Sequence, residues 1–283
     1  MIVEADVRIT VLVENTAPPR DLLAEHGLSF WIEHPRGHIL FDTGRTDAFA
    51  HNARVLGIDL SLADAIVLSH GHSDHSGGLA MAMQIAPTAR VYLHPEALSP
   101  KFSRHADGAI HDLTLPSPAL DQLRARLIFT ERPTEVLPGV FASGAIPRRH
   151  DFEAAAEGLF LDPACTRPDL VPDDQSLYFP CAKGIVILVG CAHAGIINTI
   201  DHIRAASGGG PIYAVIGGLH LRSASEARML ATLDALRQRD LHVLAPAHCT
   251  GRNQTARLQR TFPDRFRECA AGSRFVFELM EKA

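Results

Sequence analysis

The 283-residue chain lacks the long apolar runs of membrane proteins: no stretch reaches the roughly 18 residues that a membrane-spanning helix needs. It also lacks a basic excess, because its formal net charge is -5, whereas nucleic-acid-binding proteins usually carry a basic patch or stripe. The first seven residues contain two acids and no basic residue, which does not fit a secretory signal. These absences predict a protein that binds neither membranes nor nucleic acids.

Cysteine is scarce as well. The five cysteines are scattered and odd in number, which argues against a disulfide framework. A reducing compartment is the simplest environment for such a chain, so we expect it to be cytoplasmic. Hydrophobic residues make up 46% of the chain, an ordinary value for a globular protein. The length fits one large domain, and we take residues 1–283 as a single domain.

Histidine, by contrast, is concentrated in one short segment. His70-Gly71-His72-Ser73-Asp74-His75 places three imidazoles and a carboxylate directly after the apolar run 65–68. A strand that ends at this run would direct the four side chains into one small volume. Imidazole nitrogen and carboxylate oxygen are ligands that Zn²⁺ and its first-row neighbours bind, so the segment predicts a metal centre. The alternative is a solvated polar loop that happens to be rich in histidine.

Apolar periodicity predicts the surrounding elements. We expect strands over 7–13, 28–33, 38–41, 65–68, 90–94, 184–189, 211–216, 241–245 and 273–277. Helices are expected over 47–56, 79–85, 195–206, 223–239 and 255–261, with Ser223 or Ser225 capping the fourth. Strand-rich halves that are each backed by helices indicate two facing sheets with helices outside.

Two segments, 95–120 and 147–175, show no clear pattern. Connections of this length are usually functional or mobile. Each is either a lid or pocket rim, or an unremarkable surface loop.

Three later strands each run into a turn that carries a histidine. These histidines are His193, His220 and His248. Because loops at one edge of a layered fold gather functional side chains, we expect these residues to join the first cluster.

The His-x-His-x-Asp-His segment after an apolar strand resembles the signature of the metallo-β-lactamase superfamily. Several further motifs resemble one branch, whose members are described as similar to the methanogen dihydropterin-pathway enzyme that makes ribofuranosylaminobenzene 5'-phosphate. These motifs include Glu14-Asn15, Glu25-His26-Gly27, Asp42-Thr43-Gly44, Gly190-Cys191-Ala192-His193 and His248-Cys249-Thr250-Gly251. The resemblance implies an α/β fold, a four-layer αββα sandwich with the metals at one edge.

The resemblance also implies a ligand set. One metal would be held by His70, His72 and His193, and a second by Asp74, His75 and His248. Two Zn²⁺ ions are expected, with iron and manganese as alternatives. Asp42 would orient a ligand histidine, unless it serves only as a turn former at the end of a strand.

One position departs from the family pattern. Most relatives supply a bridging aspartate directly after a glycine at the end of a strand, whereas here Gly190 is followed by Cys191. The bridge could come from Cys191, from His193, from Asp174 or from hydroxide alone. The sequence does not choose among these four.

Such a centre implies a hydrolase in which a metal-bound hydroxide attacks a small ester, with a phosphoester favoured. Asp74 would bind metal and orient the nucleophile. His220 would donate a proton to the leaving group or bind an anionic oxygen, unless it is a structural histidine. Candidates for gripping a phosphate or contacting the substrate are Lys101, Arg148, Arg149, Glu25 and His26.

Other functions remain open at this point. The branch suggests a pterin-pathway synthase or transferase, and the same ligands around iron would suit an oxidoreductase. A metal-stabilised binding protein without turnover is a further alternative. The expected partner is a small-molecule substrate, with a second copy of the chain as an open question.

Overall fold

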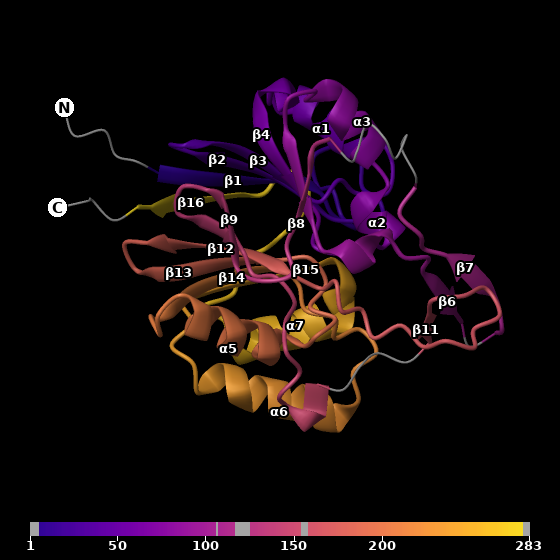
Figure 1. Cartoon of the computed structure of the whole chain (residues 1–283). Coiled ribbons are helices and arrows are strands. Elements are labelled where there is room, and N and C mark those ends of the chain that lie inside the picture. The colour runs from indigo at the N-terminus through magenta and orange to yellow at the C-terminus, as the bar shows by residue number, and fades with distance from the viewer. Residues whose placement is uncertain (1–5, 106, 117–124, 154–157, 280–283) are drawn as a thin grey trace.

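The computed structural model describes residues 6–105, 107–116, 125–153 and 158–279 (Figure 1). Its first large sheet has seven strands in the order β16-β1-β2-β3-β4-β5-β8. Their bounds are β1 (Asp6–Val13), β2 (Ser29–His34), β3 (Gly37–Phe41), β4 (Ala63–Val67), β5 (Arg90–Leu93), β8 (Leu127–Phe129) and β16 (Arg274–Glu278).

The second large sheet has six strands in the order β15-β14-β13-β12-β10-β9. Their bounds are β9 (Thr134–Leu137), β10 (Val140–Ala142), β12 (Ser176–Cys181), β13 (Gly184–Val189), β14 (Ile212–Gly218) and β15 (Val243–Ala247). The helices are α1 (Ala48–Val55), α2 (Ser73–Ser76), α3 (Leu79–Ile85), α5 (Ile196–Ala206), α6 (Glu226–Arg237) and α7 (Arg252–Thr261).

The layers follow from which apolar faces pack together. Ile9, Phe30 and Leu188 belong to a core cluster between the two sheets. A second cluster joins the outer face of the first sheet to α1 and α3, and a third joins the outer face of the second sheet to α5, α6 and α7. Each such side chain contributes roughly 1.5–3 kcal/mol when it is fully buried. The order is therefore helix, sheet, sheet, helix, as the sequence predicts (Figure 1).

Parallel pairing decides where the functional side chains lie. Strand β3 pairs in parallel with β4, and β13, β14 and β15 run parallel to one another. The carboxyl ends of parallel strands meet at the same edge of a sheet. The turns that follow these strands therefore bring Asp42, the 69–75 segment, His193, His220 and His248 to one edge of the sandwich.

Several predicted bounds need correction. Helix α6 begins at Glu226 rather than near residue 223, because the Ser225 side chain accepts the Arg228 N–H at 3.2 Å and caps the helix there. Helix α7 begins at Arg252, three residues before the predicted start. Strand β12 is absent from the prediction, although all of its residues except Pro180 are buried and it pairs antiparallel with β13.

The two unpatterned segments contain structure of their own. Strands β6 (Phe102–Arg104), β7 (Ile110–Asp112) and β11 (Leu159–Phe160) form a three-stranded sheet to one side of the sandwich (Figure 1). Single turns of 3-10 helix occur at Leu60–Leu62, Pro95–Leu98, Asp151–Glu153 and His248–Thr250. Positions 106, 117–120 and 154–157 of these segments lie outside the described residues. No helix in the described part of the chain is long and apolar enough to cross a membrane.

Candidate metal centre

Two histidines at this edge have their ring orientation set by neighbouring acceptors. Oδ2 of Asp42 lies 2.7 Å from Nδ1 of His75, and Oδ1 of Asn15 lies 2.9 Å from Nδ1 of His248. A carboxylate oxygen and an amide oxygen only accept hydrogen bonds, so both Nδ1 atoms carry the proton. The ring nitrogen that is left to bind a metal ion is therefore Nε2 in each histidine.

These two Nε2 atoms lie 3.2 Å apart. Two lone pairs at that distance repel one another unless a cation lies between them, and Zn²⁺ or a similar ion fits this demand. Burial alone would lower the pKa of His75, but the carboxylates of Asp42 and Asp74 outweigh it and raise that pKa to about 9.

The other half of the centre contains His70, His72 and His193. Nε2 of His70 lies 2.9 Å from Nδ1 of His72, and the rings of His70 and His193 are 4.8 Å apart. Burial lowers the pKa of His72 to about 4 and holds those of His70 and His193 well below 6.5, so all three are neutral. Nε2 of His72 and both ring nitrogens of His193 are buried without a hydrogen-bond partner in the described structure. Buried neutral imidazoles with free nitrogens are what a metal ion requires.

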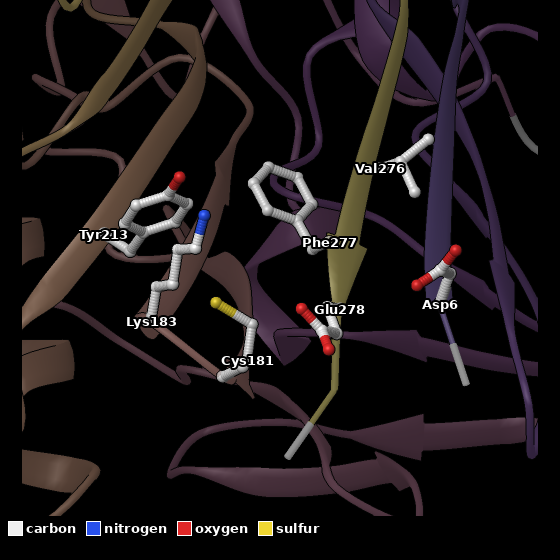
Figure 2. A pocket seen from close by; sticks show the side chains of 8 residues that line it. Asp6, Cys181, Lys183, Tyr213, Val276, Phe277 and Glu278 are labelled. Atoms are coloured by element: carbon white, nitrogen blue, oxygen red, sulfur yellow. The ribbon is translucent and has the colours of Figure 1, made fainter. Parts of the chain in front are cut away.

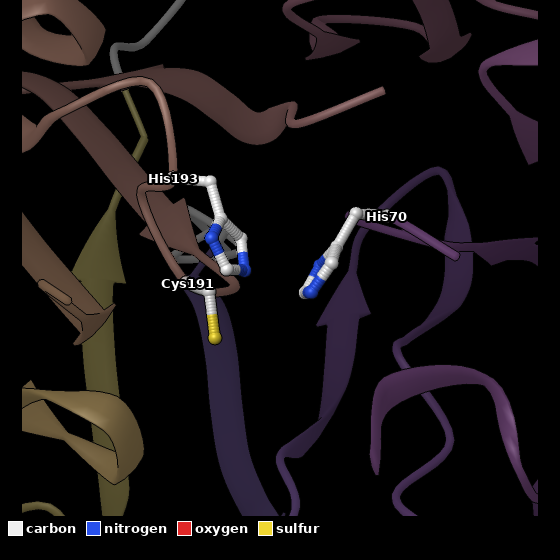
Figure 3. A group of neighbouring side chains, drawn as sticks. All are labelled: His70, Cys191 and His193. Atoms are coloured by element: carbon white, nitrogen blue, oxygen red, sulfur yellow. The ribbon is translucent and has the colours of Figure 1, made fainter. Parts of the chain in front are cut away.

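Cys191 lies between the two halves. Its Sγ atom forms one group of potential ligands with His70 and His193 and another with His75 and His248, the donor atoms of each group lying within 4.8 Å of one another. His70 approaches from the first sheet, while Cys191 and His193 approach from the second (Figure 3). The sulfur is 3.1 Å from Nε2 of His75.

Asp74 occupies the side of the centre that is open to solvent. Its Oδ2 atom lies 3.2 Å from Nε2 of His248, 3.4 Å from Nε2 of His26 and 3.8 Å from Nε2 of His75. Burial would raise the pKa of Asp74, but His75 and His248 hold it well below its usual range, so the carboxylate is ionised. The side chain of His26 is 46% exposed, so this residue is partly buried and lies at the rim.

His220 lies beside the first half rather than within it. Its ring is 4.3 Å from that of His193, and its Nδ1 atom is buried without a hydrogen-bond partner in the described structure. It forms a separate group of potential ligands with Cys191 and Cys249. The predicted site residues therefore converge: His70, His72, Asp74, His75, His193 and His248 around the centre, and His220 at its border.

The backbone is strained at this edge. Four residues there that are not glycine have positive φ: Asp42 (58°), Ala192 (48°), His220 (49°) and His248 (51°). Such a conformation costs of order 1–3 kcal/mol each and persists only where the surrounding structure enforces it. Here it turns the chain sharply at the end of a strand, so that side chains face the centre.

Supporting residues explain several motifs that the sequence alone left without a role. Oε1 of Glu14 accepts the His248 N–H at 2.8 Å, and Asn15 contacts the ring of the same histidine. Glu25 accepts the N–H groups of Arg45 and Thr46 at 2.8 and 3.2 Å. Glu25 therefore stabilises the turn at Arg45 and Thr46, whereas the sequence predicts a contact with the substrate.

The three predicted phosphate-binding cations do not act together. Lys101 is 1% exposed and its Nζ atom lies 3.0 Å from Asp169 and 2.9 Å from Asp173, so it has no free donor that faces solvent. Arg148 donates to the carbonyl oxygens of His193 and Leu170, at 2.6 and 2.7 Å. Lys101 and Arg148 therefore stabilise the segments around the site. Of the three cations, Arg149 is the one that is exposed.

Asp174 is one of the four candidates for the bridge. Its Oδ2 atom accepts the Ala194 N–H at 2.7 Å, and burial raises its pKa to about 7 despite the lowering effect of that bond. In the part of the chain that the structure describes, Asp174 belongs to none of the groups of potential metal ligands. Its contact instead fixes the turn that follows His193.

A hollow of about 240 Å³ lies at the opposite ends of the strands (Figure 2). It is lined by the turn between β12 and β13 and by the outer ends of β1 and β16, with Lys183, Tyr213 and Glu278 among its side chains. Because the clustered histidines lie at the other edge, this hollow has no part in their chemistry.

Comparisons with known proteins agree with this geometry. The chain is 30% identical over 287 residues to the 7,8-dihydropterin-6-methyl-4-(beta-D-ribofuranosyl)-aminobenzene-5'-phosphate synthase of Methanocaldococcus jannaschii, covering 96% of this chain and 97% of that protein. An uncharacterised protein of the same organism is 31% identical over 257 residues, covering 89% and 94%.

A solved structure described as a metal-dependent hydrolase of the beta-lactamase superfamily superposes with a TM-score of 0.79 at 30% identity. The match covers 95% of this chain and 98% of that one. The metallo-beta-lactamase superfamily profile itself matches residues 23–248, which span all the histidines of the centre. With its αββα layers and this histidine-rich edge, the chain belongs to the metallo-beta-lactamase superfamily.

Proposed function

We propose that this protein is a metal-dependent hydrolase of a small ester, with a phosphate ester as its substrate. The observation that carries the proposal is the facing pair of Nε2 atoms on His75 and His248, 3.2 Å apart, beside an ionised Asp74 at the open side. The similarity to a solved metal-dependent hydrolase supports the same reaction class.

The ligand set that we propose is the one expected from the sequence. His70, His72 and His193 would hold one ion, and Asp74, His75 and His248 a second. Bound Zn²⁺, or iron or manganese in its place, would supply a Lewis acid and lower the pKa of a water molecule toward neutrality. Asp42 and Asn15 would keep the two facing rings in the tautomer that binds metal.

Asp74 would orient the attacking water. Its Oδ2 atom lies at the rim beside His26 and His248, where it can accept a hydrogen bond from water on the solvent side. The histidines behind it are at most 5% exposed, which leaves the Asp74 and His26 side for the substrate to enter.

His220 would donate a proton to the leaving group. Its unpartnered Nδ1 atom and its place beside His193 support this role. Arg222 is exposed and would attract an anionic substrate. It lies close enough to His26 to act on it, because the pKa of His26 is lowered first by burial, then by His248, and further by Arg222. A cation at the rim favours a phosphate ester over a neutral lactone.

The experiment is a screen of metal-loaded protein against phosphomonoesters, phosphodiesters, thioesters and lactones, with Asp74→Ala as the matched control. We expect turnover of a phosphate ester that falls by about 100-fold or more in the variant. Equal rates in both proteins, or no turnover of any ester, would contradict the proposal.

A second candidate is a pterin-pathway synthase, because the similarity to the Methanocaldococcus enzyme extends over nearly the whole of both chains. Product analysis with a dihydropterin that carries a leaving group on its 6-methyl carbon and with ribofuranosylaminobenzene 5'-phosphate as the acceptor tests it. A product that joins the two substrates would favour the synthase, and free phosphate or alcohol alone would favour the hydrolase. Elemental analysis of protein purified without added metal tests the iron-dependent oxidoreductase, which a dominant iron signal would favour.

A further inference from the structure

We infer that Cys191 provides a sulfur ligand shared by both metal positions. The inference deepens the proposed function, since it depends on the proposed metal centre, but it concerns an assignment that the fold alone leaves open. The class of ligand is a thiolate, and the class of cation is a borderline-soft divalent ion such as Zn²⁺ or Co²⁺.

The first argument is position. Among the described residues, four groups of side chains could hold a metal, and Cys191 belongs to three of them. One of these groups contains His70 and His193, and another contains His75 and His248. No histidine and no carboxylate belongs to both of these two groups, so Cys191 is the residue that they share.

The second argument is the way the chain delivers the sulfur there. Gly190 precedes Cys191, and a Cβ atom at Gly190 would lie 2.0 Å from Oγ of Ser69 and 3.2 Å from Oδ2 of Asp42. Strand β13 can therefore approach the segment that carries the first histidines only because this residue has no side chain. The approach places Sγ of Cys191 3.1 Å from Nε2 of His75.

The third argument is elimination among the other bridging candidates. Asp174 is held by the Ala194 N–H, 2.7 Å from its Oδ2 atom, and lies in none of the donor groups. His193 belongs to the first group only. If hydroxide alone formed the bridge, the thiol of Cys191, which is 3% exposed, would lie beside both groups of histidines without binding metal.

Binding of a metal ion to Cys191 releases one proton. The Sγ–H bond breaks, its proton passes to solvent, and the sulfur lone pair forms the bond to the metal. The metal is neither oxidised nor reduced, so the step needs no other reactant.

Cobalt substitution tests the inference directly. Co²⁺ bound to a thiolate has an intense near-ultraviolet absorption that Co²⁺ bound only to nitrogen and oxygen lacks. We expect this band in the wild-type protein, its loss in Cys191→Ser, and its retention in Cys181→Ser. Cys181 is the matched control because it is also buried but lies at the opposite ends of the strands, in none of the groups of potential ligands. Retention of the band in Cys191→Ser would overturn the inference.

Titration distinguishes a shared sulfur from a ligand to one ion. If both ions bind Cys191, the band grows with the first and the second equivalent of cobalt. Growth with one equivalent alone would contradict sharing. Cys191→Asp is expected to bind both ions without the band, because a carboxylate can bridge as well.

A measurement on the wild-type protein covers the case in which a variant does not fold. Zinc loading should protect Cys191 from alkylation by iodoacetamide at partially denaturing urea concentrations, as read by mass spectrometry. Equal labelling with and without zinc would contradict the inference. The outcome is separable from that of the ester screen: a cobalt–sulfur band without ester turnover removes the proposed function only, and turnover without the band removes the Cys191 assignment only.

Discussion

Asp42 and His75 form a fully buried pair in which Oδ2 of the aspartate lies 2.7 Å from Nδ1 of the histidine. The same carboxylate accepts the backbone N–H and the hydroxyl of Ser69, each at 2.7 Å. One side chain at the end of β3 therefore positions both the start of the histidine segment and its last ring.

We predict that Asp42→Ala weakens zinc binding by about 10–100-fold, because His75 loses the acceptor that fixes its tautomer and its angle. Competition with a chromophoric chelator measures the change. Asp234→Asn, which alters an exposed ion pair with Arg237, is the control and should bind zinc as the wild type does. An unchanged affinity in Asp42→Ala would mean that His75 does not depend on this partner.

Metal removal should lower the stability of the protein. A bound ion would lie between buried ring nitrogens that come together only in the folded chain, so it stabilises that state alone. Zinc at about 100 times its dissociation constant is expected to add about 2.7 kcal/mol per site to the free energy of unfolding. Thermal unfolding with chelator and with excess zinc measures this difference, and coincident curves would argue against a metal centre.

Lys101→Met should destabilise the protein by about 3–5 kcal/mol, because Asp169 and Asp173 would remain buried without their cation. Asp173 also accepts the Gly71 N–H at 2.7 Å, so the loss extends to the histidine segment. Urea denaturation measures the effect, with the exposed Lys183→Met as the matched control. A loss as small as that of the control would show that the buried ion pairs are dispensable.

The stability contribution of Glu153 should depend on pH. Burial raises its pKa above 4.5, although its oxygens accept the N–H groups of Ile197 and Asn198 at 2.8 Å each, in the first turn of α5. As pH rises above 4.5, the unfolded chain loses this proton before the folded chain does, so unfolding becomes easier. The free energy of unfolding of the wild type, relative to Glu153→Gln, should therefore fall from this pH upward.

Unfolding in urea at a series of pH values, with chelator present in both proteins, measures that relative free energy. Subtracting the Gln variant removes the titration of all other groups. A difference that rises with pH would have the wrong sign and would exclude the raised pKa.

Much of the architecture and the histidine cluster could be predicted because their signals are local. Three imidazoles and a carboxylate follow a buried strand directly, and parallel strands carry later histidines to the same edge. The partners of Lys101 could not be predicted, because Asp169 is 68 positions away and nothing in the intervening sequence shows that the two meet. A lysine in an unpatterned segment looks the same whether it faces solvent or a buried carboxylate.

Long sequence separation also explains why the sequence does not predict that Asn15 orients His248, and why it does not select Cys191 among the candidates for the bridge. Asn15 is separated by 233 positions from the histidine that it orients, and Cys191 by 116 from His75. Strand β12 was missed because its alternation is weak when both faces of the strand are buried.

The left-handed backbone at Asp42, His220 and His248 restricts how this edge can change over evolution. Asparagine, aspartate, histidine and glycine adopt that conformation more readily than β-branched side chains do. A mutation to valine or threonine at these positions therefore carries a steric cost in the backbone, in addition to any effect on the chemistry of the site. New activities on this scaffold should then arise more readily from the surrounding loops than from exchange of these three residues.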